Sequence, residues 1–321
     1  MEWDILANQF FWISVLAAMV RIAAPILMAA LGEMFAEQSG VLNIGLEGMM
    51  LMGAFSGFMG AYVTGNNWVG VLTGMLGGGA MSLILAYMSL NRGVDQVVTG
   101  IAINILALGV TSYLFSRISV ISIEPPRIHA FNAWAIPILS DLPWLGRILF
   151  KQTPMVYITL LLTPVCAFVL YWTKFGLKIR AIGEHPLAAD TAGVHVYGVR
   201  LACILLSGVM AGFGGAILSV GQVDIFLENM TAGRGFIALA VVVFGKWNPF
   251  RVLGAAWLFG LVDAFQLRLQ ALGFVIPFQF LLMAPYILTI VVLIGVVGKA
   301  TYPAATGIPY IVEKRRKRRS L

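Results

Sequence analysis

The sequence predicts an all-α, polytopic membrane protein, built as a bundle of eight to ten transmembrane helices. Hydrophobic residues fill 60% of the 321 positions and charged residues only 11%, whereas soluble domains carry roughly 25% charged residues. A soluble fold cannot bury so much apolar surface. The apolar runs are also long and continuous, while the strands of a membrane β-barrel are short and alternate in polarity. The spans are therefore expected to be helices.

A span needs about 20 apolar residues to cross the hydrocarbon core. The first such run contains Arg21, which suggests an interfacial piece followed by a span. A shorter run, 235–245, would cover only half a bilayer as a helix. The full-length runs are 10–31, 41–63, 67–90, 94–116, 154–173, 199–221, 250–271 and 275–297.

The basic residues orient this bundle, because cytoplasmic loops carry an excess of Lys and Arg. Residues 1–312 form the membrane domain, and the tail 313–321, with its run K-R-R-K-R-R, is expected to lie in the cytoplasm near anionic lipid. Counting back from the tail makes loop 174–198 cytoplasmic and loop 117–153 external. Nucleic-acid binding is the other common function of a basic cluster. It is not expected here, because the rest of the chain has no basic face.

Inverted repeats and broken helices are left open by the sequence. W68-V-G-V-L-T-G74 resembles F250-R-V-L-G-A255, and each follows a turn that contains Gly and Asn. The two copies would run in opposite directions through the membrane, as inverted repeats of transporters do. The match is short, and chance similarity between apolar sequences explains it equally well.

Loop 174–198 contains a short predicted helix. Pro186 suits the first turn of a helix, and Gly193 suits the position just past its end. The helix would have about two turns and a length of roughly 10 Å, too short to span. It either fits a groove on a partner protein or serves as a capped connector. Similarly, loop 117–153 is either a docking surface for a binding protein or a solvated connector.

Polar residues interrupt the run 41–63. Asn43 and Glu47 are four residues apart, which places them on one face of a helix beginning near residue 39. A carboxylate in the membrane core costs about 2.5–3.5 kcal/mol on insertion scales, so Glu47 is expected to face a cavity or a partner group. Two interpretations stay open: a broken helix that lines a solute path, and an interhelical hydrogen bond that fixes the bundle.

Two further polar sets lie inside the spans. Asn104 falls near the middle of the run 94–116, and Asp263 and Gln266 share one face of a helix over 250–271. A neutral polar solute such as a sugar or nucleoside needs amides and carboxylates along its route, without one dominant charge. The residues that fit this need are Asn43, Glu47, Asn104, Asp263 and Gln266.

Two stretches together carry a family resemblance: G183-E-H-P-L-A-A-D-T-A-G193 and S39-G-V-L-N-I-G-L-E-G48. Their combination resembles the permease subunits of ATP-binding cassette (ABC) importers. It is most similar to the branched-chain amino acid and simple-sugar permease superfamily, in particular its nucleoside-type members. The resemblance covers nearly the whole chain. It implies a non-enzymatic subunit of the bacterial plasma membrane, with a cytoplasmic C-terminus.

The same resemblance implies partners. The solute, a nucleoside or simple sugar, would be delivered by a solute-binding protein, and a second permease chain would complete a homo- or heterodimer. The chain lacks the phosphate loop G-x-x-x-x-G-K-[ST], so no cofactor is expected in it and ATP would be bound by a partner ATPase. In the family, the cytoplasmic loop docks on that ATPase. The matching residues are Gly183, Glu184, Pro186, Ala188, Ala189 and Gly193.

The rival hypothesis is an ion- or proton-coupled secondary transporter. Glu47 or Asp263 would then be the carboxylate that binds the coupling ion inside the membrane. Uptake driven by a proton gradient without any ATPase would favour this rival.

Overall fold

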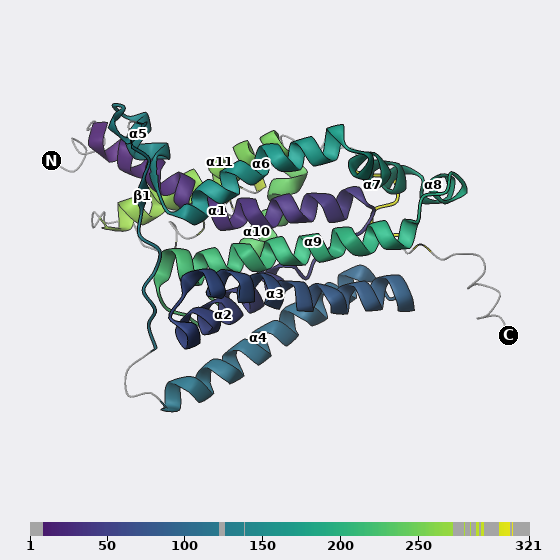
Figure 1. Ribbon diagram of the computed structural model, residues 1–321, viewed down its shortest axis with the longest axis horizontal. Coiled ribbons are helices and arrows are strands. Elements are labelled where there is room, and N and C mark those ends of the chain that lie inside the picture. Colours follow the sequence, from purple (N-terminus) through teal and green to yellow (C-terminus); the bar gives the residue numbers. More distant parts are fainter. Residues whose placement is uncertain are drawn as a thin grey trace.

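The computed structural model describes residues 9–121, 126–137 and 139–271, together with 302–308, Tyr310 and a few positions between 279 and 291. The predicted span 275–297 lies mostly outside the described residues, and the basic tail 313–321 lies wholly outside them. In the described part, long helices run side by side along the long axis of the molecule (Figure 1).

Six described helices are long and apolar enough to cross a membrane, which confirms the predicted fold class. Two of them continue as π-helix, α3 as η2 (Tyr87–Arg92) and α9 as η4 (Ile217–Val223). The six are α1 (Gln9–Gln38), α3 (Asn67–Ala86), α4 (Gln96–Ile121), α6 (Pro154–Trp172), α9 (Val196–Ala216) and α11 (Pro249–Ala271).

Two more helices lie within the bundle. The α2 helix (Leu46–Thr64) has 19 residues, and α10 (Arg234–Phe244) has only 11 residues, in line with the half-length run predicted there. The total of eight to ten spans stays a prediction, because 275–297 lies outside the described residues.

The first helix differs from the prediction. An interfacial piece followed by a span was expected, but α1 is one continuous helix of 30 residues that contains Pro25. A proline inside a helix leaves the carbonyl four residues earlier without its N–H donor. Here the side-chain amide of Gln222 donates to the carbonyl of Arg21 at 2.7 Å. This hydrogen bond compensates for the missing one, so the helix continues to Gln38.

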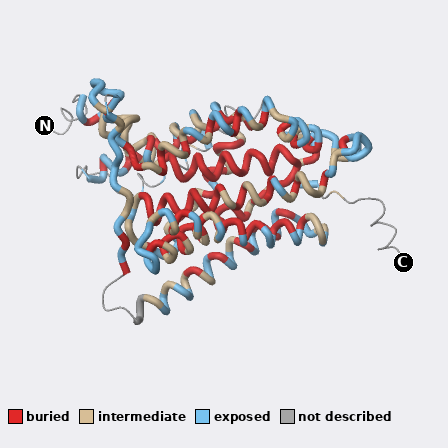
Figure 2. Tube along the Cα trace, in the orientation of Figure 1, coloured by how far each residue is buried: buried red, intermediate tan, exposed pale blue. Residues whose placement is uncertain are grey.

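The central pair of the bundle is α1 and α9, which pack against each other. Buried residues run along both helices, whereas α4, at the lower edge, is mostly exposed (Figure 2). Glycines permit the close approach of α2 to α9: a Cβ atom added at Gly53 would strike the backbone of Gly212. Such contacts between small residues are typical of membrane helix packing.

Each of the two central helices packs against helices that lie next to the other one in the sequence. The first, α1, packs on α10 and α11, whereas α9 packs on α2 and α3. Two inverted repeats, α1–α2–α3 and α9–α10–α11, would produce this arrangement. The sequence similarity between 68–74 and 250–255 also fits two inverted repeats, because Trp68 and Phe250 are each the second residue of their helix, α3 and α11.

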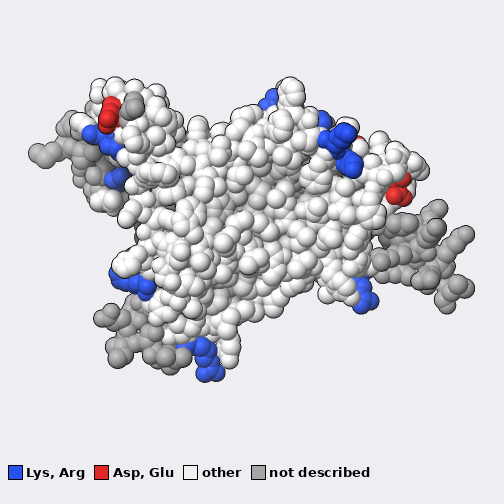
Figure 3. All heavy atoms as spheres, viewed as in Figure 1, with Lys and Arg blue, Asp and Glu red and all other residues white. Residues whose placement is uncertain are grey.

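The connecting elements gather at opposite ends of the bundle. One end carries α7 (Lys174–Glu184) and α8 (Pro186–Thr191). The other end carries β1 (Trp134–Ala135), η3 (Leu139–Asp141), α5 (Leu145–Leu149) and β2 (Lys151–Gln152), with β1 and β2 paired antiparallel (Figure 1). Charged side chains lie mainly towards these two ends, with a broad uncharged area between them (Figure 3). The loops 117–153 and 174–198 therefore lie at opposite ends of the bundle, and their assignment to the external and cytoplasmic sides stays a prediction.

Candidate functional site

The half-length helix α10 begins inside the bundle against the first turn of α2. Its first N–H groups have no acceptor within the helix. The two carboxylate oxygens of Glu47 fill this need, with Oε1 accepting from the N–H of Gly233 at 2.8 Å and Oε2 from the N–H of Gly235 at 2.6 Å. An anion at the start of a helix is also favoured by the helix dipole. Glu47 thus makes an interhelical contact with both oxygens.

Asn43 does not share a helix face with Glu47, and that prediction was wrong. The α2 helix begins at Leu46, and the preceding turn contains Gly40 with φ +85°. The N–H of Asn43 donates to Glu33 Oε1 at 2.9 Å, so it takes no part in a helical hydrogen bond. This long-range acceptor is the physical reason why the helix starts later.

Asn43 and Glu33 belong to a buried polar triad completed by Ser207 of α9. The side-chain amide of Asn43 donates to Ser207 Oγ at 3.0 Å, and the Ser207 hydroxyl donates to Glu33 Oε2 at 2.8 Å. All three side chains are fully buried. The triad holds α1, the turn 39–45 and α9 together, and Glu33 and Ser207 were not among the predicted site residues.

Asn104 also ties helices together. Its Oδ1 accepts from the N–H of Gly48 at 2.8 Å, and its Nδ2 donates to the carbonyl of Ile44 at 3.0 Å. This α4 side chain therefore clamps the first turn of α2. The polar side-chain atoms of Asn104 and Glu47 are engaged by protein groups in this conformation.

Asp263 and Gln266 on α11 differ from these residues. Gln266 is buried, and its Oε1 has no hydrogen-bond partner among the described residues. Asp263 is half-buried, and Arg234 of α10 acts on it electrostatically. The Thr231 hydroxyl is also buried and unpartnered within the described chain. These side chains keep hydrogen-bonding capacity that a solute could use.

Sequence reasoning missed Arg234 and Thr231. Both lie next to the start of the run 235–245. A cation and a hydroxyl placed before a half-length apolar run, which cannot cross the bilayer alone, would have been the signal.

The predicted short helix is present as α8. Pro186 is its first residue, and Gly193 follows its end with φ +83°. Ala188 is exposed, whereas Ala189 is buried and packs with Ile182 and Val196. Ala188 is thus available to a partner, whereas Ala189 packs onto the bundle.

The α7 residues predicted for coupling lie at the end of that helix. Gly183 is buried so closely against the carbonyl of Gln38 that a Cβ atom could not fit there. Glu184 is exposed. Gly183 therefore anchors the loop to α1, and Glu184 presents its side chain outwards.

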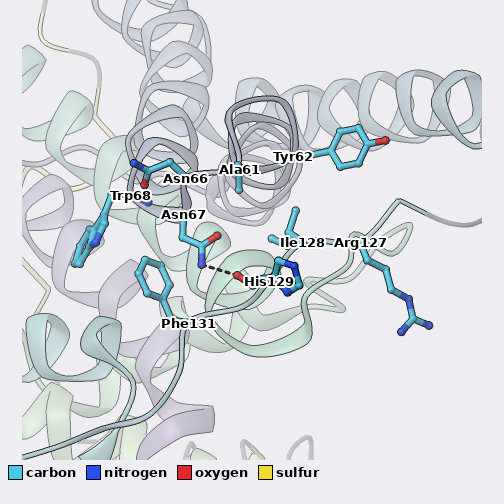
Figure 4. Close-up of a pocket in the computed structure, with 10 residues that line it drawn as sticks. Ala61, Tyr62, Asn66, Asn67, Trp68, Arg127, Ile128, His129 and Phe131 are labelled. Carbon is cyan, nitrogen blue, oxygen red and sulfur yellow. Dashed lines mark hydrogen bonds between the residues drawn. The ribbon is translucent and has the colours of Figure 1, made fainter.

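A pocket of about 400 Å³ opens at the other end, between the α2–α3 turn and residues 127–131 (Figure 4). The side-chain amide of Asn67 donates to the carbonyl of His129 at 2.5 Å. The rings of Trp68 and Phe131 meet edge to face, 5.1 Å apart. Aromatic faces beside amide groups suit a planar polar molecule or an aromatic side chain of a partner protein.

Comparisons with known proteins agree on one family. Residues 15–302 match the family model described as branched-chain amino acid transport system / permease component. Guanosine ABC transporter permease protein NupQ of Bacillus subtilis (strain 168) is 42% identical over 305 residues, which cover 91% of this chain and 95% of NupQ. Putative glucose ABC transporter permease protein TsgC13 of Haloferax volcanii is 40% identical over 267 residues, covering 82% of this chain and 80% of TsgC13.

A solved structure shares the fold. It is described as an inward-facing conformation of a putative metal-chelate type ABC transporter, and it aligns with a TM-score of 0.51 at 15% identity, over 88% of this chain and 85% of that one. Together with the sequence matches, this defines the class of protein. The chain belongs to the permease family of the branched-chain amino acid transport systems, as a membrane-spanning transport subunit of an ABC transporter and not an enzyme.

Proposed function

We propose that this chain is the permease of a nucleoside importer, with the α8 end in the cytoplasm. The observation that carries the nucleoside assignment is the 42% identity to NupQ across nearly the full length of both chains. Membership of an ABC permease family argues against the secondary transporter. The contacts of Glu47 also argue against its binding a coupling ion, because both of its carboxylate oxygens already accept backbone N–H groups.

An ABC permease works with an ATPase and a binding protein, and the two ends of the bundle suit these partners. The basic residues Lys174, Lys178 and Arg180 lie on α7, next to α8, which supports a cytoplasmic position for this end. There, the exposed face of α8 would dock on the ATPase. The opposite end, with its aromatic pocket, would receive the binding protein. A second permease chain, identical or related, would complete the pathway.

For the solute path we propose Asp263 and Gln266 of α11, together with Arg234 of α10, which lies close enough to interact with Asp263. Unpartnered amide and hydroxyl groups there match the donors and acceptors of a ribose or a base. Asn43, Glu47 and Asn104 would act around the path by holding the ends of α2 and α10 in place.

Uptake measurements decide the solute. The chain, with its ATPase and binding protein, is reconstituted in proteoliposomes and supplied with labelled guanosine. Unlabelled nucleosides should compete, and glucose should not. The second candidate is a sugar, supported by the 40% identity to TsgC13. Competition by glucose alone would favour a sugar as the solute and contradict the nucleoside proposal.

The docking role of α8 is tested by Ala188→Arg. Ala188 is exposed, so the bulky cation should block the ATPase without disturbing the fold, and uptake and copurification of the ATPase should both be lost. Ala133→Arg, at an exposed alanine of the opposite end, is the matched control for copurification of the ATPase, which it should leave unchanged. Normal association of the ATPase with the Ala188→Arg protein would refute docking through this face. Ala189→Arg is a poorer test, since Ala189 is buried against the bundle.

A further inference from the structure

A segment that follows the last predicted span returns to the α8 end of the bundle. We call its described residues, 302–308 and Tyr310, the C-terminal strap. Within it, Thr306 and Ile308 close a turn through backbone hydrogen bonds to Pro303 and Ala305. The strap makes backbone contacts with two elements that are far apart in the sequence. The N–H of Ala305 donates to the carbonyl of Gly183 at 2.8 Å, and the N–H of Gly307 donates to the carbonyl of Gly40 at 3.2 Å.

Arg200 of α9 joins the strap to the turn 39–45. Its side chain is only 1% exposed, and a buried guanidinium must be hydrogen-bonded to be tolerated. Its Nε donates to the carbonyl of Ser39 at 3.0 Å, and one terminal nitrogen donates to the carbonyl of Ile308 at 3.1 Å. The turn that holds Asn43 and the strap thus share one buried cation.

Tyr310 joins the strap to α8. Its hydroxyl donates to Asp190 Oδ2 at 2.9 Å, and its ring packs with the cluster of Ile182, Ala189 and Val196 beneath α8. Burial, and after it the hydrogen bond and charge of Asp190, raise the pKa of this hydroxyl, with Arg200 acting in the opposite direction. The hydroxyl therefore stays protonated and remains a donor at neutral pH.

A third contact lies at the start of the strap. The ring of Tyr302 meets the ring of Trp247 edge to face at 4.9 Å. The Trp247 indole N–H donates to Glu37 Oε2 at 2.5 Å, and its carbonyl accepts from the side-chain amide of Gln38 at 2.9 Å. The strap consequently contacts the turn before α11 directly, and Trp247 of that turn links it to the end of α1.

We propose that the C-terminal strap carries movement of α8 to the turn 39–45, with Tyr310 and Arg200 as the positioning residues. The contacts lead from Asp190 through Tyr310 to Arg200, whose guanidinium lies 5.9 Å from the centre of the Tyr310 ring, and from Arg200 to Ser39, four residues before Asn43 of the buried triad. A displacement of α8 by the ATPase would reach α1, the start of α2 and α9 by this route. The inference rests on the proposed docking of α8.

The test measures the number of solute molecules transported per ATP hydrolysed by the complete transporter in proteoliposomes. Tyr310→Phe keeps the ring and removes only the hydroxyl, and this ratio should fall by about fivefold, the size expected for loss of one net hydrogen bond. Tyr87→Phe removes a surface hydroxyl of η2 that accepts from Arg92, and it should leave the ratio unchanged. An unchanged ratio in Tyr310→Phe would overturn the proposal. A purely structural role would lower the yield of transporter and leave the ratio constant.

A linker experiment tests the same route in the other direction. In the double variant Asp190→Cys/Tyr310→Cys the hydrogen bond is lost, so the ratio should be low. A short bismaleimide that joins the two positions should restore it, because α8 and the strap would again move together. A ratio that stays low after complete linking would contradict the proposal. If α8 does not dock at all, Ala188→Arg will retain the ATPase, so the two failures are distinguishable.

Discussion

Glu47 is a carboxylate inside the membrane domain that is stabilised by backbone groups. Its insertion costs about 2.5–3.5 kcal/mol, and a hydrogen bond to a charged group contributes about 1.5–3 kcal/mol. Two such bonds, to the N–H groups of Gly233 and Gly235, are enough to offset that cost. The balance explains why a carboxylate is found where an apolar residue would otherwise be expected.

Replacing Glu47 by Gln should therefore destabilise the protein. The amide keeps one acceptor oxygen, but its NH₂ group would face the second N–H donor, at a cost of about 2 kcal/mol. Thermal unfolding in detergent should show a clearly lowered Tm. Glu228→Gln, at an exposed position, serves as the control. Equal Tm values for the two variants would mean that Glu47 does not hold α10 as described.

Among the elements, α9 packs closely against α2 and α3 through its glycines. Gly212 of α9 lies so near the backbone of α3 that a side chain would strike the carbonyl of Gly74. Gly212→Leu should push α9 away from α2 and α3 and prevent stable accumulation of the protein in the membrane. Gly109→Leu is the matched control, because nothing lies within 4 Å of a Cβ atom at that glycine of α4. Normal levels of the Gly212→Leu protein would contradict this packing.

Elements defined by local signals were predictable from the sequence. The two-turn helix α8 follows from Pro186 and Gly193, and the six long helices follow from the length of the apolar runs. Features that depend on residues far away in the sequence were not predictable. The continuity of α1 past Pro25 requires Gln222, 201 positions from the freed carbonyl of Arg21.

The candidate site shows the same division. The cost of a carboxylate in the membrane predicts that Glu47 faces a partner group. The sequence does not identify that group, because Gly233 is 186 positions away. Asn43 was misplaced on a helix because its N–H is taken by Glu33, and no local pattern signals that capture. The position of Asp263 and Gln266 on one helix could be predicted, because helical spacing is a local property; their place on the solute path stays a proposal.

In the described part of the molecule, the helices α10 and α11 pack against α1, and α2 and α3 pack against α9. The α8 helix and the C-terminal strap lie at one end of this bundle, and α5 lies with the β1–β2 pair at the other. The uncharged area between the ends matches the expected contact with lipid hydrocarbon (Figure 3). Signals between a binding protein and an ATPase would have to cross this full length. The central pair, which packs against α2, α3, α10 and α11, is the structural unit that connects the two ends.

The two ends should consequently lie on opposite sides of the membrane. Asn132 and Thr191 are exposed at the α5 end and the α8 end, and the native Cys166 and Cys203 are buried, so background labelling by thiol reagents will be low. In intact cells, a membrane-impermeant maleimide should label Asn132→Cys and not Thr191→Cys. In inverted membrane vesicles, the pattern should reverse. Labelling of Thr191→Cys in intact cells would place α8 outside, where no ATPase could reach it.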